Sequence, residues 1–110
     1  MEQMMLVMQV SDTDPDVRTA AAYALHGTTL TDGMAAMLLV GKLDDTNPDV
    51  RNAAAYALQG TTIQDGMAAM SLVGKLDDTD PDARRLAAYA LHGTTITDPA
   101  AAELLARYSQ

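Results

Sequence analysis

The sequence predicts an all-α fold, a short right-handed α-solenoid built from helical hairpins. The chain repeats itself every 33 residues, as Pro15, Pro48 and Pro81 show, and a period of this length is typical of solenoids. Alanine supplies 20 of the 110 residues whereas Cys, Phe and Trp are absent, and small side chains favour close contact between helices. Asp-Pro pairs and glycines recur at the same points of each repeat, where they start and stop helices.

About three and a half repeats fill the chain, and we expect them to form one domain over residues 1–110. The full repeats are residues 12–44, 45–77 and 78–110, and the first two differ at only six of 33 positions. Residues 1–11 align with the second half of a repeat. One helix from the half repeat and two from each full repeat give seven expected helices.

The first helix of each full repeat begins at an Asp-Pro or Asn-Pro pair. The side chains of Asp14, Asn47 and Asp80 are suitable N-caps, and proline is tolerated at the first helical position because its missing N–H has no partner there. We expect these helices to end at glycines with left-handed backbone. These are Gly27, Gly60 and Gly93. An apolar stripe at helical spacing is assigned to the core, and it comprises Val17, Ala21, Ala24 and Leu25 in the first full repeat.

The second helix follows a short Thr-Thr link. Its expected N-caps are Asp32, Asp65 and Asp98, and Pro99 after the last of them supports the boundary. We expect this helix to end near Leu43 and Leu76, where an Asp-Asp-Thr loop begins. Its core stripe in the first full repeat comprises Ala36, Leu39, Val40 and Leu43.

The motif D-x-D/N-P-D-V-R-x-A-A-A-Y-A-L-x-G, followed by a second amphipathic helix, resembles HEAT-like repeats of the type named after phycobilin lyases. The resemblance covers the whole chain and recurs three times. It implies that the first helices form a convex layer and the second helices line a concave one. It also implies a structural role for Arg18, Arg51 and Arg84, which are expected to pair with loop Asp residues and align adjacent repeats. The third repeat departs from the motif, with Ala83 in place of Val.

A second apolar stripe on the second helices is the most informative functional feature. It contains all eight Met residues, on the side opposite the core stripe. The candidate partner-binding residues are Met4, Met5, Met8, Met34, Met37, Leu38, Met67, Met70 and Leu104. Methionine suits surfaces that adapt to different partners, and an exposed stripe of this size exceeds the usual apolar patch of a monomer. The alternative is that these side chains pack between successive helices as ordinary core.

Two interpretations of an exposed Met stripe stay open. In the first, the concave face binds a helix or apolar peptide of a partner protein, in the helix-in-groove manner. In the second, the same face forms a structural homodimer with no other ligand. The row formed by Tyr23, Tyr56 and Tyr89 on the first helices either contacts a partner or packs over the neighbouring repeat.

Composition excludes several other classes. Seven basic against fifteen acidic residues, a net charge of −8, argue against nucleic acid as a partner. No apolar run is long enough to span a membrane and no signal peptide precedes the repeats, so we expect a cytoplasmic protein.

No catalytic, cofactor or metal site is expected. The Asp12-x-Asp14-x-Asp16 string lacks the Gly and Glu that an EF-hand loop needs at its sixth and twelfth positions. Enzymes that use HEAT-like scaffolds, such as bilin lyases and DNA alkylation-repair glycosylases, have longer chains. A lyase-related protein or an accessory subunit of a larger enzyme is therefore only a remote alternative.

Overall fold

The computed structural model describes residues 8–108 of the chain. Six α-helices, three two-residue strands and two short 3-10 helices alternate along this part. Their bounds are α2 Pro15–Ala24, β1 Thr29–Leu30, α3 Gly33–Gly41, η1 Lys42–Asp44, α4 Pro48–Gln59, β2 Thr62–Ile63, α5 Gly66–Gly74, η2 Lys75–Asp77, α6 Pro81–Leu91, β3 Thr95–Ile96 and α7 Pro99–Tyr108. The predicted all-α solenoid of hairpins is confirmed, with six α-helices in the described part instead of seven. The expected helix of residues 1–11 falls mainly on residues 1–7, outside the described residues.

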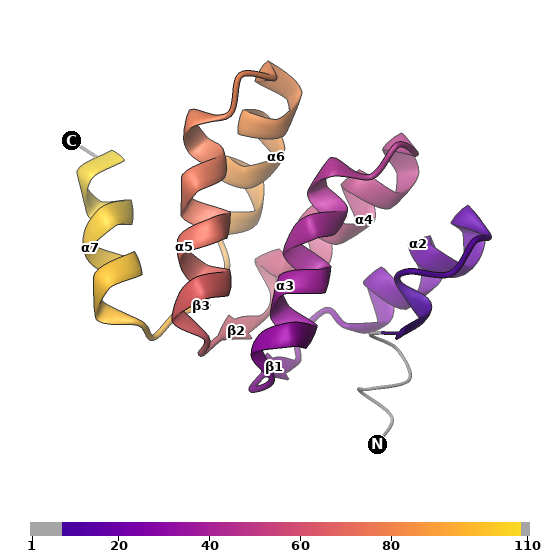
Figure 1. Cartoon of the computed structure of the whole chain (residues 1–110), viewed down its shortest axis with the longest axis horizontal. Helices are drawn as coiled ribbons and strands as arrows, with labels where there is room; N and C mark the ends of the chain where they lie inside the picture. Colours follow the sequence, from indigo (N-terminus) through magenta and orange to yellow (C-terminus); the bar gives the residue numbers. More distant parts are fainter. Residues whose placement is uncertain (1–7, 109–110) are drawn as a thin grey trace.

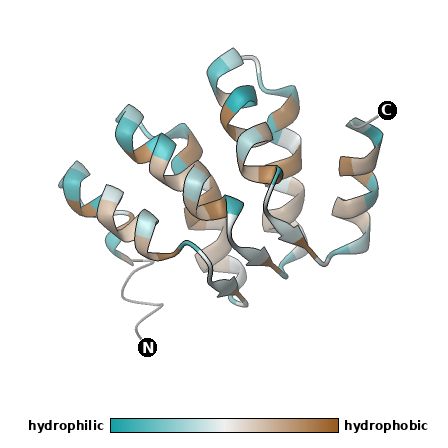
Figure 2. Cartoon of the chain, turned by 180° about the vertical axis from the view of Figure 1, so that it is seen from behind, coloured by the Kyte–Doolittle hydropathy of each residue, from teal (hydrophilic) through white to brown (hydrophobic). Residues whose placement is uncertain are grey.

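The helices form two layers (Figure 1). One layer contains the first helices α2, α4 and α6, and the other contains the second helices α3, α5 and α7, each packed on its neighbours within the layer. Figure 2 shows the polar residues concentrated at the loop ends of the first helices. Between the layers lies a core of Ala, Leu, Val and Ile, in which leucines such as Leu25, Leu39 and Leu58 are fully buried.

Short strands join the two helices of each repeat, where only a Thr-Thr link was predicted. The strands pair in parallel in the order β1-β2-β3, with Thr29 opposite Thr62 and Thr62 opposite Thr95. Thr62 N donates to Thr28 O and Thr95 N donates to Thr61 O. This ladder fixes the register of successive repeats at the turn side of the molecule.

The second helices end earlier than expected. The α-helical part of α3 stops at Gly41 and that of α5 at Gly74, and the chain continues as the 3-10 helices η1 and η2 before the acidic loop. A tighter last turn of this kind is common because it gives the final carbonyl groups partners within the chain. Leu43 of η1 still points into the core and is fully buried.

The expectation of left-handed backbone at the end of each first helix holds for one glycine and is wrong for two. Gly27 has a φ of 83°, whereas Gly60 has a φ of −102° and Gly93 also lies outside the positive range. At the two later positions the preceding repeat occupies the space that a side chain would need. A Cβ on Gly60 would lie 2.5 Å from His26 Nε2, and one on Gly93 would lie 2.2 Å from Gln59 O.

The core stripe predicted for the first helix is only partly buried in the first full repeat. Ala21 and Leu25 are buried, but Val17 is half-buried and Ala24 is exposed. The equivalent residues of the second full repeat, Val50 and Ala57, are completely buried because α2 covers them. No described helix packs on the corresponding side of α2, so the prediction fails there for lack of a neighbour.

Candidate interaction surface

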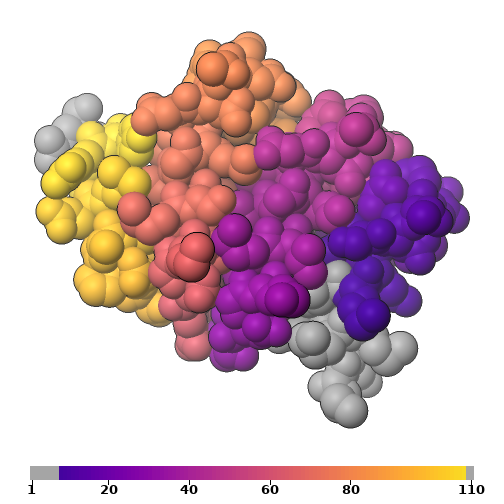
Figure 3. Space-filling model, viewed as in Figure 1, coloured from indigo at the N-terminus to yellow at the C-terminus, as the bar shows by residue number. Residues whose placement is uncertain are grey.

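The second helices α3 and α5 divide their side chains between the core and an exposed face. Ala35, Ala36, Leu39 and Val40 of α3 are buried, as are Ala68, Ala69, Leu72 and Val73 of α5. The side chains between them point outward, and these include four methionines. The exposed fractions are 70% for Met34, 40% for Met37, 76% for Met67 and 40% for Met70. We call the surface formed by these four residues the Met face; α3 and α5 lie on the side turned to the viewer in Figure 3.

The Met face contains a hollow of about 620 Å³ between α3 and α5. Its lining comprises Met37, Gly66, Met67, Met70, Ser71 and Asp98. Ser71 occupies the position that Leu38 has in the preceding repeat, and the smaller side chain leaves more room in the second repeat. The carboxylate of Asp98 is the charged group in this lining. A predominantly apolar floor with one acidic wall can receive an apolar side chain next to a cationic one.

The remaining predicted partner-binding residues have different environments. Met8 is 71% exposed, whereas Leu38 and Leu104 are half-buried and pack against the core. Met4 and Met5 lie outside the described residues. Leu38 and Leu104 therefore contribute edges to the surface, and the exposed apolar area comes from methionine.

The N-caps of the second helices stand at one end of the Met face. Asp32 Oδ1 accepts a hydrogen bond from Met34 N at 3.1 Å, and Asp98 Oδ2 accepts one from Ala101 N at 3.0 Å. Asp65 Oδ2 likewise accepts from Ala68 N at 2.9 Å. These capping bonds hold one carboxylate per repeat in a row along the ends of α3, α5 and α7.

The arginines of the first helices lie in the acidic loops at the other end of the molecule. Arg18 Nε is 3.2 Å from Asp45 Oδ2 of the following repeat, and its Nη1 donates to Asp12 O at 2.8 Å. Arg51 Nη1 donates to Asp45 O at 2.7 Å, and Arg51 Nε is 3.7 Å from Asp82 Oδ2. Arg84 Nη1 donates to Asp78 O at 2.6 Å, within its own repeat. Arg18 and Arg51 thus link consecutive repeats.

The N-caps of the first helices belong to the same loops. Asp14, Asn47 and Asp80 each accept a hydrogen bond from the backbone N–H two residues later, at 2.8–2.9 Å. Asp12 Oδ1 in turn accepts from Asp14 N at 2.9 Å. These local bonds account for the alternating Asp string, and no group of three His, Cys, Asp or Glu among residues 8–108 has a geometry that could hold a metal ion.

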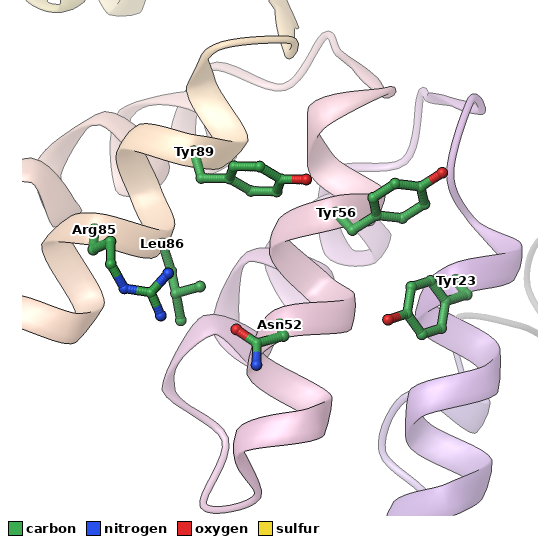
Figure 4. A pocket seen from close by; sticks show the side chains of 6 residues that line it. All are labelled: Tyr23, Asn52, Tyr56, Arg85, Leu86 and Tyr89. Carbon is green, nitrogen blue, oxygen red and sulfur yellow. The ribbon is translucent and has the colours of Figure 1, made fainter.

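The tyrosine row lies on the first helices, on the other layer of the molecule. Tyr23, Tyr56 and Tyr89 are each exposed by 40–49% and line a hollow of about 260 Å³ with Asn52, Arg85 and Leu86 (Figure 4). Tyr56 packs against two rings of the preceding repeat, with centroid distances of 5.5 Å to Tyr23 and 4.4 Å to His26. Helical spacing places His26 on the same face as Tyr23, but its stacking on Tyr56 depends on the packing of two repeats and was not predicted.

Arg85 is the basic side chain in that hollow, and Asp82 already engages it. Its Nε and Nη2 atoms donate to Asp82 Oδ1 at 3.2 and 2.8 Å. The cation of the tyrosine hollow is therefore already paired. The hollow's volume, about 260 Å³, is also smaller than the 620 Å³ of the hollow on the Met face. The Met face offers the larger exposed apolar surface.

Stacked helical hairpins in two layers, joined by inter-repeat contacts at both ends, define an α-solenoid. A profile of the HEAT repeats matches residues 36–110, and the chain belongs to this family. The match does not distinguish the phycobilin lyase type, which stays a prediction. Comparison with curated protein sequences gives no match. HEAT repeats generally mediate protein–protein interaction and are typically non-enzymatic scaffolds. None of the helices in residues 8–108 has the length and apolar character needed to cross a membrane.

Proposed function

We propose that this chain is a non-enzymatic interaction module whose Met face binds a helix or an apolar peptide segment of a partner protein. The exposure of the four methionines carries the proposal. They lie on two adjacent helices in equivalent positions, so the same chemical surface is presented twice side by side. Their flexible side chains can adapt to the outline of a bound helix.

The energetics favour covering this surface. Full burial of one Met side chain is worth about 1.5–3 kcal/mol, and Met34 and Met67 are each more than two-thirds exposed. Burying four partly exposed methionines therefore supplies a driving force of several kcal/mol before the entropy cost of association is subtracted. The hollow next to Ser71 provides a place for one anchoring side chain, which is how helix-in-groove complexes fix their register.

The proposal is tested with protein carrying ¹³C-methyl methionine and a neutral amphipathic probe helix of Leu, Ala and Gln. The expected result is that the probe shifts the methyl resonances of Met34, Met37, Met67 and Met70. Met37→Glu and Met70→Glu should weaken binding at least tenfold, because each places a charge in the contact. Tyr89→Glu, an exposed change on the other layer, is the matched control and should bind as the native protein does.

The outcome that contradicts the proposal is a probe that leaves these four resonances unchanged. Binding that Tyr89→Glu weakens and that Met37→Glu and Met70→Glu leave unchanged would also overturn it. The homodimer alternative is separated by light scattering coupled to size exclusion without any probe. A dimer that Met37→Glu converts into folded monomers would mean that a second copy already covers the Met face.

A further inference from the structure

The charged groups without an ion pair beside the Met face are acidic, and this asymmetry identifies the chemistry of its partner. Building on the proposed function, we infer that the partner segment is a cationic amphipathic helix. Its apolar side contacts the Met face, and its Lys or Arg side chains lie against the carboxylates at the rim.

The end of the Met face at which α3 and α5 begin, called its first end, is acidic. Asp32, Asp65 and Asp98 lie there, one per repeat, and none of the ion pairs found among residues 8–108 involves them. One carboxylate oxygen of each Asp accepts the capping hydrogen bond of its helix, and the second oxygen is left for a partner. The helix dipole offsets part of this charge, since it is equivalent to about half an elementary charge, but the row stays net negative. Asp98 also reaches the hollow itself.

The second end of the Met face has lysines, but acidic residues already occupy them. Lys42 Nζ is 3.9 Å from Asp45 Oδ2, and Lys75 Nζ is bonded to Asp44 Oδ2 of the preceding repeat. Both lysine side chains are largely covered, with exposed fractions of 20% and 15%. Arg107 of α7, the remaining cation on this layer, lies 3.5 Å from Glu103 Oε1. An acidic partner would therefore meet only paired cations among the described residues of this layer, whereas a basic one meets carboxylates without ion pairs where α3, α5 and α7 begin.

The charge pattern also separates a foreign partner from a second copy of this chain. The whole sequence carries −8, so two Met faces brought together would also bring like charges together. A basic helix has the opposite effect, because its long Lys and Arg stems add apolar contact while their heads reach the rim. A partner helix that lies across both α3 and α5, whose axes are separated by an ordinary packing distance, needs about 12–16 residues.

Three synthetic helices of 16 residues test this inference. They share one leucine face. All remaining positions are Lys in the first helix, Gln in the second and Glu in the third. At low salt the Lys helix is expected to bind at least tenfold more tightly than the Gln helix, and the Glu helix more weakly than either. Raising the ionic strength to 1 M shortens the screening length to about 3 Å and should bring the Lys and Gln helices close together.

Substitution at the rim provides the decisive comparison. Asp65→Asn together with Asp98→Asn removes two charges while keeping a residue that caps helices well. This variant is expected to lose most of the preference for the Lys helix and to bind the Gln helix unchanged. The matched control is Asp80→Asn, a cap in the remote loops whose equivalent in the preceding repeat is naturally Asn47.

Each outcome distinguishes this inference from the proposed function. Equal binding of the Lys and Gln helices, or equal effects of the rim and control variants, would overturn the cationic partner and leave the Met face as a docking surface. Lys-helix binding that shifts no Met methyl resonance would mean non-specific attraction and would also overturn it. If none of the three helices shifts those resonances, the proposed function itself fails.

Discussion

The first glycine of α3 and that of α5 lie against the N-cap of the next second helix. A Cβ on Gly33 would lie 2.6 Å from Asp65 Oδ1, and one on Gly66 would lie 2.8 Å from Asp98 Oδ1. In both places the N-cap of the next second helix occupies the space that a side chain would need. The equivalent residue of the third repeat is Pro99.

The contrast between crowded and open glycines gives a residue-scale prediction. Gly93→Ala should destabilise the fold by about 1–3 kcal/mol, because its Cβ would lie 2.2 Å from the backbone oxygen of Gln59. Gly41→Ala is the matched control, since nothing lies within 4 Å of the Cβ position at the end of α3. It should stabilise the protein by about 0.4–1 kcal/mol through the unfolded chain. Urea unfolding measures both, and a Gly93→Ala variant as stable as the native chain would contradict the close contact.

At the scale of elements, equivalent residues keep the same contact even when their chemistry changes. Lys75 of η2 is bonded to Asp44 of the preceding repeat. Tyr108 stands 33 residues later, at the end of α7, and its hydroxyl donates to Asp77 Oδ2. The tyrosine therefore makes the contact between second-helix ends that the lysine makes one repeat earlier.

This tyrosine predicts a pH-dependent contribution to stability. The hydrogen bond to Asp77, followed by desolvation and the charge of the same carboxylate, raises the pKa of Tyr108 above its ordinary value of 10.0. A pKa that is higher in the folded chain means that the contribution is fully present below pH 10 and is lost as the pH rises through the raised value. Tyr108→Phe should therefore be less stable than the native chain at pH 8, and the difference should vanish at higher pH.

Chemical unfolding across this pH range measures the difference, and absorbance of tyrosinate should show that Tyr108→Phe removes an ionisation at high pH. Tyr89→Phe, on an exposed ring of α6, is the control for losing a hydroxyl. A stability difference that stays constant from pH 8 to beyond the raised pKa would show that the hydroxyl of Tyr108 does not bond to Asp77.

Elements with local signals were predictable from the sequence. The first helices begin at Pro15, Pro48 and Pro81 because proline and the residue before it define a helix start without help from distant contacts. The parallel strands were missed, since a two-residue strand such as β2 has no hydrophobic period and exists only through its neighbours. The same reason explains Gly60, where the His26 ring of another repeat occupies the space that a side chain would need.

The candidate surface was predictable in composition but not in detail. Helical spacing placed Met34 and Met37 on the side of the second helix opposite the core, and the structure leaves both exposed. Spacing within one helix cannot give the distance between two helices. The hollow at Ser71 and the approach of Asp98 to it depend on how α3, α5 and α7 pack, and therefore emerge only from the structure.

At the scale of the whole molecule, stability depends on nearest-neighbour contacts between repeats. The second repeat has neighbours on both sides, and Val50, Ala54 and Ala57 are completely buried. On α2 the equivalent positions line an apolar hollow of about 490 Å³ that includes Val17 and Ala24. A repeat at the edge therefore buries less apolar surface than one in the middle.

Insertion of another middle repeat should for this reason stabilise the protein. The insert is a second copy of residues 45–77 placed after Asp77, and its junction reproduces the natural Asp-Asp-Thr sequence. In a solenoid each added repeat contributes its own stability and one further interface, so both the thermal midpoint and the unfolding free energy should rise. The m-value, which is the slope of the unfolding free energy against urea concentration, should also rise by roughly 30%, in proportion to chain length, if the longer chain unfolds in one transition.

Thermal and urea unfolding of the two chains test this expectation, with Ala57→Asp in the inserted copy as the control. That change puts a charge at a position that is completely buried in the native second repeat, and it should cancel the gain. A longer chain with an unchanged midpoint, or with two separate transitions, would mean that the repeats do not support one another through their interfaces. The expected single, steeper transition instead follows from packing in which α4 contacts both α2 and α6 and completely buries Ala53, Ala54 and Ala57.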